Sequence, residues 1–129
     1  MTTNFLEVTN EELEWLSNDE LHELLFQKAF VEQQEYRNWL LELKPMTILC
    51  HADEYSKRED IVYAIGELFG DSLSREQMYA LLLSPTPVAD IYKWLAKCEA
   101  ATSDYMSDVR TYVEDVANRY IAERSICNG

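Results

Sequence analysis

Glycine and proline are scarce in this chain, with three of each among 129 residues. A β-sheet protein needs such residues to separate its strands, and only Gly66 lies inside a periodic apolar segment. We therefore expect an all-α fold.

Long hydrophobic runs are also missing. No apolar segment approaches the roughly 18 residues that span a bilayer, and the first residues lack the basic start and apolar stretch of a signal peptide. Cys50, Cys98 and Cys127 are far apart and outside any C-x-x-C spacing, so neither a disulfide framework nor a zinc knuckle is indicated. We expect a soluble cytoplasmic protein with reduced thiols and no membrane partner.

Basic residues are few, eleven against 24 carboxylates, for a net charge of −13. The excess is concentrated in residues 1–43, where ten carboxylates face two cations. Such a surface repels phosphate polymers and anionic lipids, which proteins bind with Lys and Arg. Direct nucleic-acid binding is therefore not expected. The apolar content of 47% nevertheless predicts a folded core, and the length suits one domain.

What the sequence does contain is helical periodicity. "SNDE" at 17–20 has the pattern of a capping box, and apolar residues then recur at helical spacing until Pro45. A second stripe runs from Pro45 to Gly70 and predicts a second helix. "TNEELEWL" predicts a short helix before them.

The second half of the chain repeats these signals. "SREQ" at 74–77 predicts another capping box and a short helix that "SPTP" ends, after which Thr86 is expected to cap a last helix led by Pro87. The apolar stripe of that last segment alternates steps of three and four, which would suit one helix of about 55 Å. Its members are Val88, Ile91, Leu95, Cys98, Thr102, Tyr105, Val109, Tyr112 and Val116.

Together these patterns predict one domain over residues 1–129, with an acidic extension or short helix at 1–17 and a bundle of about four helices at 18–126. The long C-terminal stripe has two interpretations. It can cover the first two helices, or it can pair two copies of the chain.

The stretch "HADEYSKRED" at 51–60 is the densest cluster of reactive groups. At helical spacing Asp53 lies near Lys57 and Glu54 near Arg58, in the favourable acid-before-base order. H-E-x-x-H and phosphate-binding glycine motifs are absent, and the adjacent Cys50 and His51 would point about 100° apart on a helix. We expect no enzyme, metal site or cofactor, but a structural polar network of Glu54, Tyr55, Arg58, Glu59 and Asp60. An enzyme built on these residues and His51 is the weaker alternative.

Aromatic residues divide into two groups. Four tyrosines, Tyr36, Tyr55, Tyr105 and Tyr112, lie on the expected core stripes. Trp15 and Trp94 lie off these stripes beside charged neighbours, which favours contact with a partner.

Four phrases, "LLFQKAFVEQQEYRNWLLELKP", "HADEYSKREDIV", "LLLSPTPVADIYKWL" and "SDYMSDVRTYVEDVANR", resemble an uncharacterised family of small acidic proteins from gut Firmicutes and their mobile elements, named only as a domain of unknown function. The resemblance runs from about Glu20 to Arg124. It implies no established activity, but it favours roles that mobile elements encode, including neutralisation of host restriction or CRISPR systems. The residues that carry it are Glu32, Gln33, Tyr36, Arg37, Trp39, Tyr55, Arg58, Glu59, Asp60, Ser84, Pro85, Pro87, Ala89, Asp90, Asp104, Tyr105, Met106 and Arg110.

The functional hypothesis is a non-enzymatic protein-binding module that imitates DNA. Carboxylates on adjacent helical turns lie about 5–6 Å apart, which lets them imitate a row of phosphates in the basic groove of a host nuclease. The alternatives are acidity that serves only solubility, and an adaptor that self-associates through its C-terminal helix as a homodimer rather than a monomer. The expected partner-binding residues are Glu7, Glu11, Glu12, Glu14, Trp15, Asp19, Glu20, Glu23 and Trp94.

Overall fold

The computed structural model describes residues 14–67, 73–97 and 105–128. Within this part of the chain every regular element is a helix, so the all-α prediction is confirmed. The helices are α2 (Asn18–Leu41), α3 (Pro45–Cys50), α4 (Ala52–Glu67), α5 (Arg75–Leu83), α6 (Pro87–Lys97) and α7 (Tyr105–Asn128).

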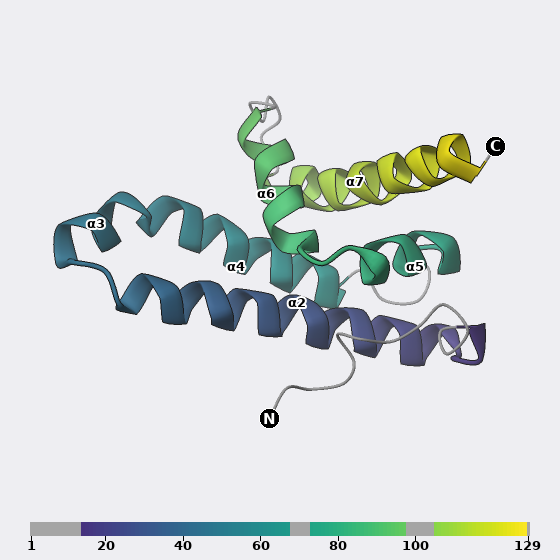
Figure 1. Cartoon of the computed structure of the whole chain (residues 1–129), viewed down its shortest axis with the longest axis horizontal. Helices are drawn as coiled ribbons and strands as arrows, with labels where there is room; N and C mark the ends of the chain where they lie inside the picture. The colour runs from purple at the N-terminus through teal and green to yellow at the C-terminus, as the bar shows by residue number, and fades with distance from the viewer. Residues whose placement is uncertain (1–13, 68–72, 98–104, 129) are drawn as a thin grey trace.

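The long helices α2 and α4 form an antiparallel pair joined at one end by α3 (Figure 1). Helix α5 lies against the N-terminal half of α2, α7 packs on α5 and α4, and α6 crosses the middle of the molecule. One continuous core joins all of them except α3, none of whose residues is buried. Fully buried members of this core include Leu21, Leu25, Ile61, Ile65, Met78, Leu81, Val88, Ile91, Val109 and Val113.

Both predicted capping boxes are present. The Ser17 hydroxyl accepts from the Glu20 N–H at 3.1 Å, while the Glu20 carboxylate accepts from the Ser17 N–H at 3.0 Å. Ser74 and Gln77 make the same reciprocal pair at the start of α5. Each box satisfies two backbone donors that a helix N-terminus leaves without partners, which is why these short sequence patterns locate the helix starts.

The single helix predicted from Pro45 to Gly70 is wrong, because the chain forms α3 and α4 with a break at His51. His51 has φ −102° and ψ 4°, and its imidazole packs edge-on against Trp39 with ring centroids 5.3 Å apart. After the break α4 runs along α2 (Figure 1). Residues 68–70 of the predicted helix lie outside the described residues.

The predicted single C-terminal helix is also wrong, because α6 and α7 are separate helices that pack against each other (Figure 1). Val88, Ile91 and Leu95 of α6 enter the same core as Val109 and Val116 of α7, which one straight helix could not achieve. Tyr112 packs against this core, and Cys98 and Thr102 lie outside the described residues. The described apolar seam positions are thus packed within one chain.

The corner between α5 and α6 is held by two charged side chains of α2, one helical turn apart. The Lys28 ammonium donates to the carbonyl of Leu82, at the end of α5, at 2.6 Å. The Glu32 carboxylate accepts from the N–H groups of Val88 and Ala89, at the start of α6, at 2.8 Å each. Glu32 thereby does what was expected of Thr86, whose hydroxyl instead faces the Asp90 carboxylate at 3.4 Å.

We predict that the two charges are coupled. Lys28→Met leaves the Leu82 carbonyl buried without a partner, and Glu32→Gln deprives one α6 N–H of its acceptor, so each change alone should lower the free energy of unfolding by about 1–3 kcal/mol. The double variant should lose less than the sum, because the attraction between Lys28 and Glu32 is lost in each single variant and is therefore counted twice in the sum. Urea unfolding of the four proteins measures this coupling, and strictly additive losses would contradict it.

Candidate functional site

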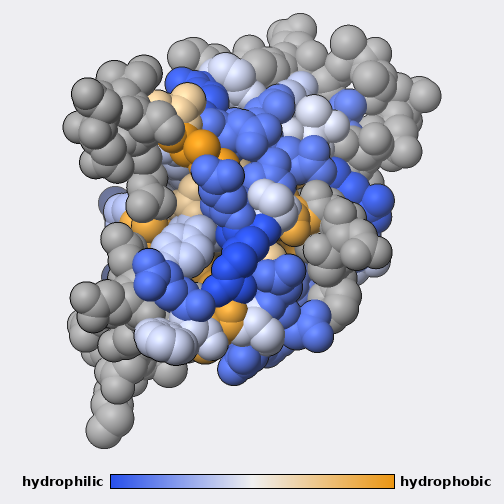
Figure 2. All heavy atoms as spheres, turned by 90° about the vertical axis from the view of Figure 1, so that its right-hand side faces the viewer, coloured by the Kyte–Doolittle hydropathy of each residue, from blue (hydrophilic) through white to orange (hydrophobic). Residues whose placement is uncertain are grey.

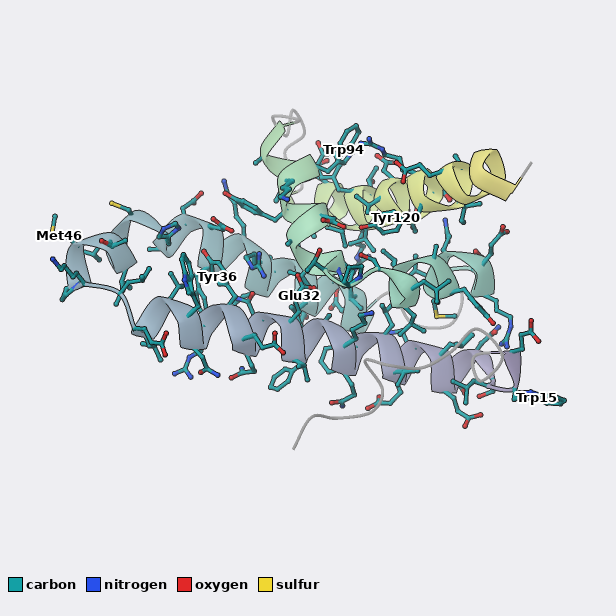
Figure 3. All side chains as sticks on the ribbon, in the orientation of Figure 1. Trp15, Glu32, Tyr36, Met46, Trp94 and Tyr120 are labelled. Carbon is teal, nitrogen blue, oxygen red and sulfur yellow. The ribbon has the colours of Figure 1, made fainter. Side chains whose placement is uncertain are left out.

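Exposed carboxylates gather where α2 begins. Glu14, Asp19, Glu20 and Glu23 are all exposed there, and Trp15 projects from this end with 86% of its surface accessible (Figure 3). Figure 2 looks at this end of the molecule and shows hydrophilic residues over most of its described surface. The remaining predicted acids, Glu7, Glu11 and Glu12, lie outside the described residues.

Beside these carboxylates the surface is hollowed by a groove of 420 Å³. Leu16 and Leu24 supply its apolar lining. We call this hollow the acid-rimmed groove, and its residues are Leu16, Asp19, Glu20, Glu23, Leu24 and Gln27.

The rim of the acid-rimmed groove is ordered by local hydrogen bonds. Hydrogen bonds with the backbone and side chain of Ser17 hold the pKa of Glu20 below its ordinary value. Gln27 donates to the Glu23 carboxylate at 3.0 Å. From α5, Arg75 donates to the Asn18 side chain and the Glu14 carbonyl at 3.1 Å each, which ties the start of α2 to α5.

Trp94, the other predicted partner contact, lies elsewhere, between α6 and α7 (Figure 3). The Arg119 guanidinium stacks 4.1 Å from the centre of the Trp94 ring. The indole N–H of Trp94 is buried without a hydrogen-bond partner among the described residues. A hollow of 240 Å³ adjoins the two side chains, with Lys93 and Glu123 in its lining. The structure therefore does not bring Trp15 and Trp94 into one site.

Next to this hollow is a hydrogen-bonded cluster that the sequence pattern did not indicate. The Tyr120 hydroxyl donates to the Asp90 carboxylate, and Ser84 lies 3.4 Å from Asp90 and 3.3 Å from Tyr120. Burial, together with the Asp90 carboxylate, raises the pKa of Tyr120 well above its ordinary value. The phenol therefore remains a protonated donor that ties α7 to the start of α6. The "SPTPVAD" phrase marks the turn but carries no sign of a partner 30 residues away.

Arg58 lies at the centre of a polar network between α2 and α4. It is 5% exposed and donates to the Gln33 side chain at 3.1 Å, with Glu32 and Glu54 each at 3.6 Å. Its guanidinium lies 4.0 Å from the centre of the Tyr36 ring. One face and the edges of this buried cation are therefore engaged by side chains from two helices.

Three other predicted members of the network, Tyr55, Glu59 and Asp60, do not share the central position of Arg58. The Gln33 amide donates to the Glu59 carboxylate at 3.2 Å, which links Glu59 to the network. The same amide donates to the backbone carbonyl of Tyr55 rather than to its side chain. The ring that lies against the Arg58 guanidinium is that of Tyr36 on α2, and Tyr55 lines a hollow near Leu41. Asp60 makes no contact with this network among the described residues.

The rest of "HADEYSKRED" faces outward or supports the turn. His51 lies 3.8 Å from Glu54 and packs on Trp39, and Lys57 pairs with Asp53 at 3.0 Å on the surface. Within the described ranges no three His, Cys, Asp or Glu residues cluster in a way that would hold a metal ion. In the same part of the chain, no helix combines the length and apolarity needed to cross a membrane.

Comparison with known proteins gives one match. The model of a family described as "Protein of unknown function (DUF3848)" matches residues 21–121. No curated protein and no solved structure matches the chain. The matched span includes the Arg58 network, the α5–α6 corner and Trp94, together with Glu23, Leu24 and Gln27 of the acid-rimmed groove.

We predict that replacing Arg58 by alanine destabilises the protein far more than replacing its neighbour Lys57. Arg58→Ala leaves Glu32, whose side chain is only 11% exposed, without its cation and should cost about 3–5 kcal/mol of unfolding free energy. Lys57→Ala breaks a shorter but solvent-exposed ion pair and should cost under about 1 kcal/mol. Thermal unfolding followed by circular dichroism compares them.

His51→Ala serves as the functional control for the same stretch. It removes a contact with Trp39 and should leave both fold and partner binding nearly intact. A His51→Ala protein that folds normally but loses all function would instead mark residues 51–60 as an active site.

Proposed function

Because the chain belongs to the DUF3848 family, whose description names no activity, we propose a function from the surface of the molecule: a non-enzymatic protein-binding module that uses the start of α2. The observation that carries this proposal is the conjunction of Trp15, 86% exposed, with the acid-rimmed groove. An exposed indole beside an apolar hollow is typical of an interface anchor.

The carboxylates favour a basic partner. Asp19 and Glu23 are four residues apart on α2, so they lie on one helix face, with Glu20 between them on the adjoining turn. Such spacing places negative charges about 5–6 Å apart, close enough to imitate successive phosphates. Attraction between unlike charges would speed association with a basic surface, and Trp15, Leu16 and Leu24 would add apolar contact that a nucleic acid itself does not supply.

The partner class we propose is a nucleic-acid-binding enzyme of the host, with a nuclease of a restriction or CRISPR system as the specific case. A basic nucleic-acid groove offers the complementary charge, and a protein seated in it would exclude the substrate. The mobile-element origin implied by the sequence resemblance fits this role. An inhibitor of this kind needs no catalytic residues and no cofactor.

The test compares charge reversals at two places. Asp19→Lys with Glu23→Lys changes the acid-rimmed groove while sparing the Ser17–Glu20 capping box. Glu35→Lys with Glu123→Lys changes the net charge equally at exposed sites on α2 and α7. We expect the first pair to weaken binding at least about tenfold, or 1.4 kcal/mol, and the second pair to have little effect.

Binding is measured by titration calorimetry at two salt concentrations against the nuclease recovered from host lysate on immobilised protein. Competition with duplex DNA should displace the complex. Equal losses from both pairs of reversals, or a complex that duplex DNA leaves unchanged, would contradict the proposal.

A further inference from the structure

The opposite end of the molecule exposes apolar side chains that the core does not use. Leu41, Met46 and Leu49 are 60%, 73% and 67% exposed, and Trp39 is also exposed. They lie where α2 passes into α3, and Met46 projects outward there (Figure 3). We call these four residues the apolar tip. None of the six residues of α3 is buried, although the helix contains Met46, Ile48 and Leu49.

A hollow of 260 Å³ adjoins the apolar tip. Its lining is apolar apart from Arg37 and the Tyr55 hydroxyl, and it includes Leu40, Ile48 and Ala52. A short helix held outside the core, with an apolar hollow beside it, leaves several large apolar side chains exposed next to one another. Such surfaces mark sites where another protein packs.

The charge around the apolar tip indicates which protein can pack against it. Residues 38–50 carry one acid, Glu42, and one base, Lys44, and so have no net charge, whereas the whole chain has −13. Two copies of this chain would repel each other across most of their surfaces. The apolar tip is the place where they can approach without that repulsion.

The same two residues make the apolar tip complementary to itself. In a two-fold arrangement each contact occurs twice, so Glu42 of one copy can face Lys44 of the other, and the reverse. Both residues are exposed, at the end of α2 and the start of α3. We propose that the apolar tip pairs two copies of this chain about a two-fold axis, with Met46 and Leu49 at its centre.

This dimer should be weak. Stable interfaces commonly bury about 1,600 Å² in total, and the apolar tip occupies only one end of an elongated molecule. The dimer is therefore expected at high protein concentration and in dynamic exchange with the monomer. Cys50, which is exposed next to Leu49, lies close enough to the proposed axis to report on it.

Sedimentation equilibrium from micromolar to millimolar concentration provides the test. The wild-type mass should rise toward that of a dimer, and Met46→Ser with Leu49→Ser should keep the monomer mass with an unchanged melting curve, because neither residue is buried. Phe30→Ser with Tyr63→Ser is the matched control, since these exposed aromatics lie on α2 and α4 away from the apolar tip. It should retain the dimer.

A charge exchange tests the two-fold geometry. Glu42→Lys places like charges opposite each other and should weaken the dimer, and adding Lys44→Glu should restore it. Mild oxidation should cross-link the wild-type protein, and Cys50→Ser should abolish the cross-linked dimer.

A wild-type protein that stays monomeric at millimolar concentration would overturn the proposal, as would equal dimerisation of the Met46/Leu49 variant. A charge exchange that fails to restore the dimer would exclude the two-fold pairing. Reversals in the acid-rimmed groove should leave the mass unchanged, so this test is independent of the proposed partner.

Discussion

The carboxylate of Glu32, whose side chain is only 11% exposed, connects parts of the structure that the apolar core alone would not fix relative to one another. Glu32 accepts two backbone N–H groups of α6 and faces Arg58 of α4, while it belongs to α2. It thus joins three helices at one point. The direction in which α6 leaves the corner depends on it, and that direction in turn sets where Trp94 and Asp90 meet α7.

The charge of Glu32 is matched to the backbone around it. A helix N-terminus carries partial positive charge and a C-terminus partial negative charge. Glu32 at the start of α6 and Lys28 at the end of α5 therefore each meet a backbone of opposite sign. Burial nevertheless opposes both charges, because it raises the pKa of Glu32 and lowers that of Lys28. We infer that Lys28 and Glu32 serve mainly to fix the geometry of the α5–α6 corner and contribute less to the total stability of the protein.

The sequence predicts the features that local patterns control and fails where distant contacts decide. Capping boxes at Ser17 and Ser74 involve residues three apart, so both helix starts were predictable. The break at His51 adjoins a contact with Trp39 on another helix, and the α6–α7 reversal leaves the apolar period intact, so periodicity gave no sign of either. The same limit applies to the sites. Acidic residues and Trp15 were identifiable from composition, whereas the acid-rimmed groove needs Leu16 and Leu24 to be seen at the surface.

The length of α2 has a consequence for how the molecule can act. Its 24 residues span about 36 Å, with Trp15 just before its first residue and the apolar tip at its other end (Figure 3). Two surfaces on opposite ends of one rigid rod can be occupied at the same time without steric conflict. If copies join at the tip, their acidic ends point away from each other, and the assembly becomes bivalent. Such a molecule could bridge two sites on one target or two target molecules, with avidity set by the span of the rod rather than by a flexible linker.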